Sequence, residues 1–512
     1  MYYTSVHIEE RRSKEPLMAQ DQSLLAPPTH APAVPVDIAW DEIIATSNTV
    51  LTTHLWAAPP LRRESPIHDR AFAALRDLKA DYARFLPWFS HPVLSVPALE
   101  APTKATTSWD FAQLDPFVED FMAAAEGRPV VANFATIPHW MFTNADHVEV
   151  SRDVDTIHWD YEQGTDFRDD TLAEVADYFF RIASWYIAGG FTDELGVRHE
   201  SGHHYRFAYW EVLCEPDLNR RMPPEVYTRL YDAVVQRLRT LDPDMRFVGL
   251  SLSHVHHDPE YFWHFLNPAN HAPDISVDAF SYHFYASPEI VNPFGAEGNA
   301  DHSTWRSTFF AQADAFVEHV AYIRSIANRL APDAKTFLNE IGTYPADVMN
   351  AAPKIPEHYW ALSGSVHAYL WARVLPLGID LLGVAEFMDY PGMIPGTSLI
   401  DWESGEPNAR YDVTKLLLDH FGPGDRLLET SAGYPGFPDA RVHVQAMRTH
   451  DGSRKLLMIS KWDEPVHLDL TSVGAGVLEQ IHTTTAGSAN ERFAGGTLHL
   501  RPHATAVLTL DN

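Results

Sequence analysis

Short runs of β-branched and aromatic residues alternate with longer amphipathic stretches from about residue 40 to residue 420. This alternation is typical of a parallel sheet whose strands are joined by crossover helices. The runs that we predict to be strands span residues 48–56, 81–89, 128–136, 207–215, 245–253, 277–285, 334–342 and 379–387.

One stretch between the fourth and fifth runs shows the helical period clearly. Val226, Leu230, Val234 and Leu238 recur at every fourth position after two consecutive prolines. Proline is favoured in the first turn of a helix, and this spacing places apolar side chains on one helix face. Further helices are predicted over residues 316–330 and 364–378. Eight strand–helix units predict an α/β fold, a closed (β/α)8 TIM barrel with its active site at the strand carboxyl ends. A doubly wound open sheet is the alternative architecture.

The residue composition and the hydrophobic pattern change at both ends of this region. Residues 1–36 mix charges with a proline-rich segment and are interpreted as a flexible N-terminal leader. Residues 37–422 are predicted to form the barrel. Beyond them, alternating runs such as KLLMIS and TAVLTL are broken by Gly, Asp, Ser and Pro, which predicts a C-terminal β-sandwich domain over residues 423–512.

Net charge and residue composition indicate which kinds of molecule the chain can bind. The formal net charge of −31 disfavours nucleic acid and anionic membrane surfaces, so neither partner is expected. Aromatic residues make up 12% of the chain and suit stacking against sugar rings, so a carbohydrate substrate is expected. The single cysteine allows no intramolecular disulfide, and the N-terminus lacks the apolar run of a signal peptide. We therefore expect a cytoplasmic location and leave homo-oligomerisation open.

Two glutamates end predicted strands on opposite sides of the barrel mouth. Glu215 ends the fourth strand in WEVLCEPD, and Glu340 ends the seventh in LNEIG. Two carboxyl groups facing each other across a substrate suit glycoside hydrolysis, because one protonates the departing oxygen while the other attacks the anomeric carbon. Taken alone, such glutamates could equally be surface carboxylates in ion pairs.

The segments around these glutamates resemble those of glycoside hydrolase family 39, a family of retaining barrel glycosidases. YWEVLCEPD is similar to its acid/base segment, Phe-Glu-Val-Trp-Asn-Glu-Pro-Asn. FLNEIGTY resembles its nucleophile segment, and FSYHFYA resembles the stretch after its sixth strand. The resemblance implies Glu215 as general acid/base and Glu340 as nucleophile, with His283 and Tyr285 lining the sugar subsite. Family activities include β-xylosidase and α-L-iduronidase, which leaves the sugar open.

The chain departs from the family pattern at three positions near the acid/base. Leu213 and Cys214 replace Trp-Asn, and Asp217 replaces the later Asn. The family asparagine can donate to a sugar 2-hydroxyl, whereas a thiol is a weak donor. Either the natural sugar makes this contact differently, or another donor, such as Asn339 or His283, supplies it. A thiolate beside an ionisable glutamate is electrostatically disfavoured, so Cys214 is interpreted as part of the site wall rather than a nucleophile.

Other strand-end residues are candidates for substrate binding. Asn133, His139 and Glu386 are candidate polar contacts, and Trp402 is a candidate aromatic wall. Each could instead serve packing.

Two histidine-rich segments raise the question of a metal site. HESGH at residues 199–203 matches the H-E-x-x-H pattern of zinc proteases, but its glycines predict a loop where zinc binding needs a helix. HVHHD at residues 254–258 is interpreted as polar loop or subsite lining, because no matching ligands follow the other strands. We predict no metal and no cofactor.

Together these features predict a retaining glycoside hydrolase that cleaves a terminal glycosidic bond, a β-xyloside or related pentoside or hexoside, through a glycosyl-enzyme intermediate. A non-catalytic glycan-binding barrel and a transglycosylase using the same carboxyl pair are the alternatives.

Overall fold

The structure is a computed structural model, which describes residues 32–87, 91–143, 149–158, 161, 164–218, 221–253, 259–288, 302–345, 355–393, 395–434, 436–482 and 490–511. Within the described residues, no helix is both long and apolar enough to cross a membrane. The cytoplasmic location stays a prediction from the sequence.

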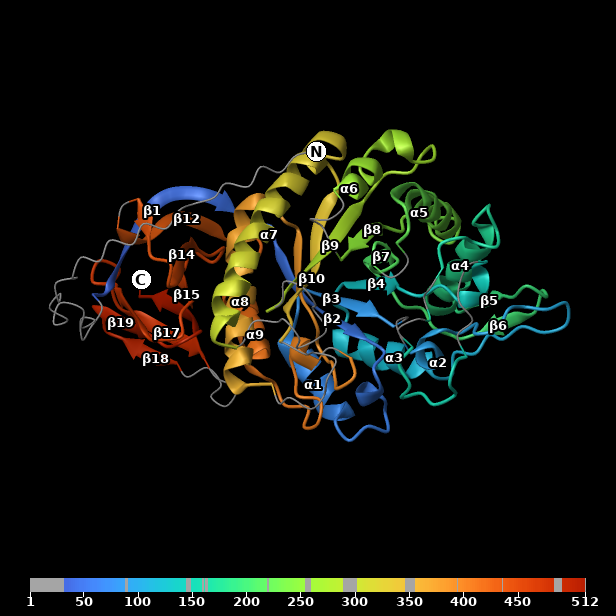
Figure 1. The fold of residues 1–512 in the computed structure, drawn as a ribbon, viewed down its shortest axis with the longest axis horizontal. Helices are drawn as coiled ribbons and strands as arrows, with labels where there is room; N and C mark the ends of the chain where they lie inside the picture. Colours follow the sequence, from blue (N-terminus) through green and yellow to red (C-terminus); the bar gives the residue numbers. More distant parts are fainter. Residues whose placement is uncertain are drawn as a thin grey trace, which may run out of the picture.

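Eight parallel strands close into a barrel, which confirms the predicted fold class (Figure 1). Each predicted run overlaps one of these strands, and β9 and β10 extend one residue beyond their runs. In order around the barrel they are β2 (Val50–Trp56), β3 (Tyr82–Leu86), β4 (Val130–Phe134), β7 (Tyr209–Val212), β8 (Phe247–Leu252), β9 (Ala279–Ala286), β10 (Lys335–Thr343) and β11 (Leu381–Val384).

Helices follow the barrel strands and cover their outer faces. They are α1 (His68–Leu78), α3 (Leu114–Ala125), α4 (Ala173–Ile187), α5 (Pro224–Leu238), α6 (Glu260–Phe265), α7 (His302–Leu330), α8 (Glu357–Val374) and α9 (Ala409–His420), with the short α2 (Pro92–Ser95) before α3. The helix predicted from the four-residue spacing is α5: it begins at Pro224 and buries Leu230, Val234 and Leu238. The other two predicted helices correspond to parts of α7 and α8.

The barrel interior is layered because side chains alternate along each strand. Val131, Tyr209, Ala279 and Phe337 belong to an apolar cluster near the amino ends of the strands. The inward residues two positions further along their strands are Asn133, Glu211, Ser281 and Asn339, all of them buried and polar. The carboxyl end of the barrel therefore holds a polar layer above an apolar plug.

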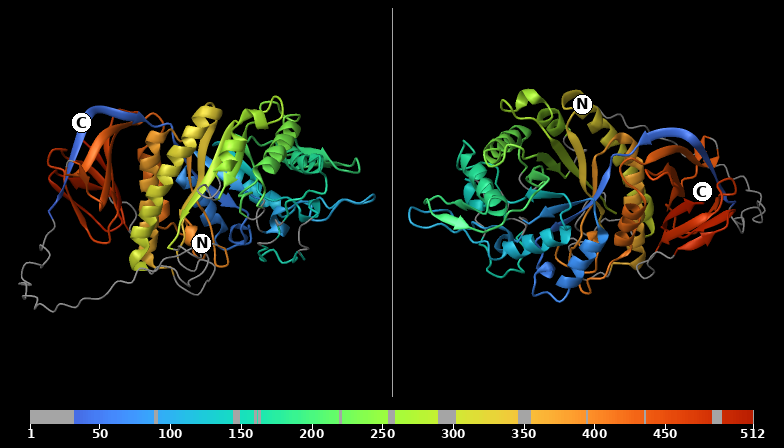
Figure 2. Two further views of the ribbon diagram at one scale, coloured as in Figure 1. Left: turned by 45° about the horizontal axis from the view of Figure 1, so that its top comes forward. Right: turned by 180° about the vertical axis from the view of Figure 1, so that it is seen from behind.

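The second domain is mostly antiparallel and lies beside α7, α8 and α9 (Figures 1 and 2). Its own apolar core, as in a β-sandwich, takes alternate residues of its strands, such as Leu456, Met458 and Leu508, whereas the intervening Leu457 and Val507 belong to the core of the barrel. Its C-terminal strands are β12 (Arg426–Tyr434), β13 (Phe437–Pro438), β14 (Val442–Arg448), β15 (Arg454–Ser460), β16 (Val466–Asp469), β17 (Gly476–Ile481), β18 (Glu491–Phe493), β19 (Thr497–Leu500) and β20 (Thr505–Leu510).

The first described strand, β1 (Val34–Thr46), also belongs to this second sheet. It pairs antiparallel with β12, as in Val36↔Ala432, and parallel with β16, as in Val34↔Leu468. The sequence analysis had divided these residues between the leader and the barrel. The strand has the sequence VPVDIAWDEIIAT. At its start, buried residues alternate with more exposed ones, and Val34 and Val36 pack into the sandwich core.

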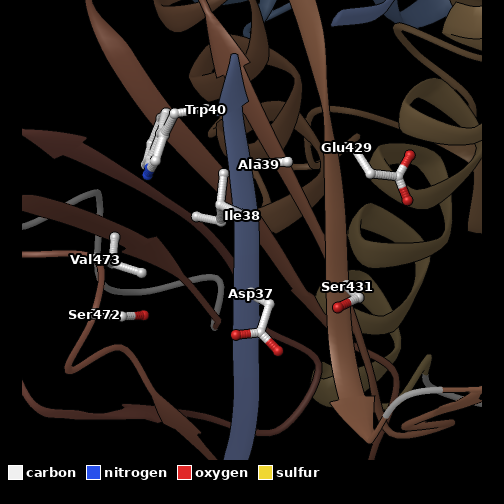
Figure 3. Close-up of a pocket in the computed structure, with 8 residues that line it drawn as sticks. All are labelled: Asp37, Ile38, Ala39, Trp40, Glu429, Ser431, Ser472 and Val473. Carbon is white, nitrogen blue, oxygen red and sulfur yellow. The ribbon is translucent and has the colours of Figure 1, made fainter. Parts of the chain in front are cut away.

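A surface pocket of about 410 Å³ lies on the sandwich around β1 and β12 (Figure 3). Its lining comes entirely from this domain, so it is separate from the barrel mouth. The lining residues are Asp37, Ile38, Ala39, Trp40, Glu429, Ser431, Ser472 and Val473.

The HESGH segment is not helical. It overlaps β6 (Arg198–Glu200), which forms a hairpin with β5 (Gly190–Thr192). His199 contacts the Asp193 carboxylate at 2.9 Å, and the His203 ring stacks on Tyr186. These contacts are structural, and the zinc-protease geometry is missing from this described segment. HVHHD lies outside the described residues.

Candidate active site

The two predicted catalytic carboxyl groups meet at the carboxyl end of the barrel. Glu340 lies within β10, and Glu215 follows β7. The Nδ1 atom of His283, on β9, lies 2.8 Å from Glu215 Oε1 and 3.2 Å from Glu340 Oε2. One imidazole nitrogen therefore contacts both carboxyl groups, which brings them to the same small site.

Glu340 is almost fully buried and surrounded by hydrogen-bond donors. Arg84 Nη1 donates to its Oε1 at 2.5 Å, and the Tyr285 hydroxyl donates to its Oε2 at 2.8 Å. Burial alone would raise the pKa of Glu340. The neighbouring histidines, the guanidinium and the phenol hydrogen bond outweigh burial and hold this pKa well below the usual carboxyl range. Glu340 is therefore an ionised carboxylate held in one orientation.

Glu215 occupies the opposite electrostatic environment. Its side chain is 20% exposed, and its described hydrogen-bonding contact is with His283. Burial raises the pKa of the Glu215 carboxyl, and the Glu340 charge adds to this, although His283 opposes both. Two carboxyl groups side by side are thus driven toward different protonation states, as an acid and a nucleophile require.

The backbone around Glu215 is unusually conformed. Leu213 and Glu215 have φ values of 63° and 47°, in the left-handed region that non-glycine residues rarely occupy. The Glu215 amide donates to the Ser251 carbonyl at 2.9 Å, and the Asp217 carboxylate accepts from the Ser253 amide at 3.0 Å. These bonds fasten the acid/base segment to the end of β8, so it is held in a conformation that the sequence alone would not favour.

A bulge in β10 aims two successive side chains into the barrel. The pairing register of β10 with β9 shifts between Phe337 and Glu340. In a regular strand Asn339 and Glu340 would face opposite sides, but the extra residue of a bulge allows both to point inward. The amide of Asn339 accordingly reaches the polar layer while Glu340 reaches the site.

The polar layer below the site is organised around Glu211. Its Oε2 accepts from Arg84 Nε at 2.7 Å and from Asn133 Nδ2 at 2.6 Å. Its Oε1 accepts from Ser281 Oγ at 2.5 Å and from Asn339 Nδ2 at 2.6 Å. Arg84 thereby spans Glu211 and Glu340. Asn133 and Asn339, expected as substrate contacts, instead make their described side-chain bonds beneath the site.

Cys214 lies beside the nucleophile candidate. Its Sγ is 3.7 Å from Glu340 Oε1 and 3.8 Å from Arg84 Nη2. Burial, and then the Glu340 charge, raise the pKa of the Cys214 thiol well above its usual value. The thiol therefore stays protonated and forms part of the site wall.

Two further residues line this end of the barrel. Tyr344 is half-buried and stacks on Tyr285, which donates to Glu340, with ring centroids 4.4 Å apart, so two aromatic rings lie beside the carboxyl pair. Glu386, which follows β11, is joined to Glu340 through His54. The sequence analysis missed Tyr344, His54, Arg84 and Glu211.

Two of the predicted substrate contacts are not brought to the carboxyl pair. His139 begins a short 3-10 helix (His139–Met141), where its ring packs edge-on against Tyr161. Trp402 is half-buried and packs on the barrel core. No contact in the described part of the chain joins either residue to Glu215 or Glu340.

The site also contains side chains of types that bind metal ions. Cys214, His283 and Glu340 form one such set, and His54, Glu340 and Glu386 form another. Both sets include Glu340, to which Arg84 donates a charged hydrogen bond. A guanidinium in this position repels a divalent cation, so the arrangement favours acid–base chemistry by the carboxyl groups.

Comparison with known proteins places the fold among glycoside hydrolases. No protein-family model and no curated protein sequence matches the chain. Among solved structures, a GH51 arabinofuranosidase from Xanthomonas axonopodis pv. citri aligns with a TM-score of 0.63 at 13% identity, covering 94% of this chain and 100% of that one. An α-L-arabinofuranosidase from Thermotoga maritima aligns with a TM-score of 0.62 at 11% identity, covering 94% and 100%.

A monomeric β-xylosidase from Caulobacter crescentus CB15 also aligns, with a TM-score of 0.57 at 16% identity, covering 94% of this chain and 99% of that one. At these sequence identities, the similarity to these proteins is one of fold. The chain has the barrel-and-sandwich fold found in these glycoside hydrolases.

Proposed function

We propose that the chain is a retaining glycoside hydrolase, with Glu340 as nucleophile and Glu215 as general acid/base. The observation that carries this proposal is the shared contact of both carboxyl groups with His283 Nδ1, at 2.8 and 3.2 Å, in environments that drive their pKa values apart. Retaining enzymes hold their two carboxyl groups about 5–5.5 Å apart, whereas inverting enzymes need about 6.5–9.5 Å. A common hydrogen-bond partner favours the shorter separation.

In the proposed reaction, a Glu340 carboxylate oxygen attacks the anomeric carbon of the glycone. The glycosidic C–O bond breaks as the Glu215 carboxyl group transfers its proton to the departing oxygen, which leaves as an alcohol. A water molecule then attacks the anomeric carbon of the glycosyl ester. Glu215, now ionised, takes a proton from this water, and the Glu340–sugar bond breaks to release the sugar and the free carboxylate.

The surrounding residues support these roles. Arg84 and Tyr285 donate hydrogen bonds to the Glu340 carboxylate and stabilise its ionised form. Glu340 is therefore ready to attack without first losing a proton. The greater exposure of Glu215 suits a group that meets the leaving group and then water. The motif resemblance favours a family 39-like enzyme acting on a terminal pentoside or hexoside, and the fold shared with arabinofuranosidases and a β-xylosidase is compatible with that range of sugars.

Turnover of a panel of 4-nitrophenyl glycosides tests the proposal, with Glu340→Gln as the key variant. We expect the wild-type chain to cleave at least one of the β-xyloside, α-L-arabinofuranoside and β-galactoside. Glu340→Gln should abolish that turnover, because an amide does not form the glycosyl ester. Added azide should restore release of nitrophenol and give a glycosyl azide of inverted configuration.

A matched control is Glu225→Gln, at an exposed position in the first turn of α5. This variant should keep wild-type rates. Near wild-type activity of Glu340→Gln on every substrate that the parent cleaves would refute the nucleophile assignment.

A further inference from the structure

A second polar pair lies beside Glu340, at Oε1 rather than at the Oε2 atom that His283 contacts. His54, on β2, is 1% exposed and places its Nδ1 3.5 Å from Glu340 Oε1. Its Nε2 lies 3.5 Å from Oε1 of Glu386, whose side chain is 12% exposed. His54 therefore bridges the nucleophile and a third carboxyl group.

The protonation state of His54 follows from its neighbours. Arg84 Nη1 lies 3.3 Å from His54 Nδ1, and a guanidinium only donates, so Nδ1 accepts and the ring proton is on Nε2. Burial lowers the pKa of His54 to about 3; the charges of Arg84 and His283 also lower it, and the negative charge of Glu340 opposes them. At neutral pH this residue is thus an uncharged imidazole that presents an N–H toward Glu386.

Both members of the pair have hydrogen-bonding capacity left over. Among the described residues, His54 Nε2 and Glu386 Oε2 are buried without a hydrogen-bond partner. Buried polar atoms are nearly always satisfied, so these two atoms are suited to receive groups of a ligand. In the proposed reaction Glu340 attacks the anomeric carbon of the sugar. Because Glu340 lies close to both residues, a sugar bound there would have its ring next to His54 and Glu386.

The charge around Glu386 defines the kind of group that fits. Burial and the charges of Asp389 and Glu340 raise the pKa of Glu386 well above its usual value, which favours the protonated carboxylic acid. A carboxylic acid donates one hydrogen bond and accepts others, as a sugar hydroxyl does. Of the two arginines near Glu386, Arg84 is already bound to Glu211 and Glu340, and Arg410 donates to the backbone carbonyls of Ala385 and Thr397. A sugar carboxylate at Glu386 would therefore meet an acid and an anion, with both neighbouring guanidinium groups already engaged.

We propose that His54 and Glu386 form a subsite for a hydroxyl group of an uncharged glycone, so that the enzyme accepts neutral pentosides or hexosides and rejects uronosides. This inference rests on the proposed glycosidase function and selects among the sugars that the motif resemblance leaves open. The hydroxyl accepts a hydrogen bond from His54 Nε2–H and exchanges a second one with the Glu386 carboxyl group.

The first test compares aryl glycosides that share the 4-nitrophenyl leaving group. The neutral set contains the β-xyloside, α-L-arabinofuranoside and β-galactoside, and the charged set contains the α-L-iduronide and β-glucuronide. We expect kcat/KM for the best neutral substrate to exceed that for the best uronoside by at least about 100-fold, because a site built for a hydroxyl leaves an anion unpaired. Equal or greater rates on a uronoside would overturn the inference while the hydrolase function stands.

The second test locates the contact with monodeoxy analogues of the best neutral substrate. In the wild-type enzyme, removal of one particular hydroxyl should lower kcat/KM by about tenfold or more. Glu386→Ala should lower kcat/KM for the parent glycoside by a similar factor but leave the rate for that deoxy analogue nearly unchanged. Glu386→Gln, which still donates and accepts, should retain more activity than Glu386→Ala.

Glu403→Ala is the matched control, since this glutamate is exposed on the loop after β11. It should behave as wild type on every substrate. If Glu386→Ala lowers the rates of all deoxy analogues by one common factor, the residue supports the fold rather than a hydroxyl contact, and the inference is wrong. If no glycoside of either set is cleaved, the proposed function fails and the inference falls with it.

Discussion

Removal of the Arg84 guanidinium should damage stability and catalysis through two different carboxyl groups. Arg84 is 1% exposed and donates to Glu211, which is fully buried, and to Glu340. Breaking a buried ion pair from one side typically costs about 3–5 kcal/mol, because the remaining charge is left uncompensated. Asn133, Ser281 and Asn339 still donate to Glu211 in the variant. We therefore expect Arg84→Met to lower the free energy of unfolding by about 3 kcal/mol, the lower end of this range.

Catalysis should change in a way that a merely structural defect would not reproduce. Without the guanidinium, the pKa of Glu340 should rise, since an adjacent opposite charge typically lowers a carboxyl pKa by about 1–3. The acid limb of the pH profile of kcat/KM reports protonation of the nucleophile, so it should move upward in pH. Arg84→Lys keeps the charge, but a single ammonium does not reach both carboxyl groups in the forked geometry of arginine. Its loss of stability should be smaller than that of Arg84→Met.

Urea unfolding at pH 7 and pH profiles of kcat/KM measure the two effects. Arg492→Met is the matched control, because Arg492 is 59% exposed and pairs with Asp511 on the sandwich surface. Exposed ion pairs contribute about 0–1 kcal/mol, so this variant should unfold close to wild type. An Arg84→Met variant as stable as Arg492→Met, with an unshifted acid limb, would refute the idea that Arg84 compensates Glu211 and Glu340.

Four further outcomes follow from the site. Glu215→Ala should slow substrates with poor leaving groups far more than activated aryl glycosides, since only the former need protonation; equal losses would indicate a structural role. In the wild type, kcat/KM should fall as pH rises through the raised pKa of Glu215, because the proton donor is lost, and Glu215→Gln should remove this alkaline limb; a limb that persists belongs to another group. Cys214→Ser should keep activity within about tenfold, roughly 1.4 kcal/mol, whereas a nucleophilic thiol would lose several orders of magnitude. Cys214→Asn should raise the ratio of kcat/KM values for 2-hydroxy over 2-deoxy glycosides, and an unchanged ratio would mean that position 214 does not face the 2-hydroxyl.

The fold was largely predictable because its signals are local. Strand runs that alternate with helical periods at a regular spacing predict a barrel whichever residues fill its interior, and all eight runs overlap barrel strands. The placement of β1 was not predictable in this way. Its partners, β12 and β16, lie at the other end of the chain, and no local pattern states which sheet a strand will join.

The sequence placed Glu215 and Glu340 at the ends of predicted strands, and in the structure they lie at the carboxyl end of the barrel, Glu215 three residues after β7 and Glu340 near the end of β10. Glu211 lies two residues after Tyr209 on the same strand. Two-residue periodicity therefore predicts that both side chains point into the barrel, so Glu211 could have been identified from the sequence. Arg84 was harder to identify, because a buried arginine is rare and is stabilised here by two carboxyl groups from distant strands. Asn339 follows the regular alternation from Phe337, but the inward position of the next residue, Glu340, depends on the bulge between Phe337 and Glu340, and no feature of LNEIG signals that bulge.

The assignment of Glu340 as a covalent nucleophile is tested most directly by trapping the intermediate. The protein is incubated with the 2-deoxy-2-fluoro derivative of whichever activated aryl glycoside it cleaves, because the fluorine slows both steps and the good leaving group allows the first. Proteolysis and mass spectrometry then locate the added glycosyl mass. We expect one glycosyl group per chain, attached to Glu340 and absent from Glu340→Gln. A label on another residue, or turnover of the aryl glycoside with inverted product and no label, would contradict the account.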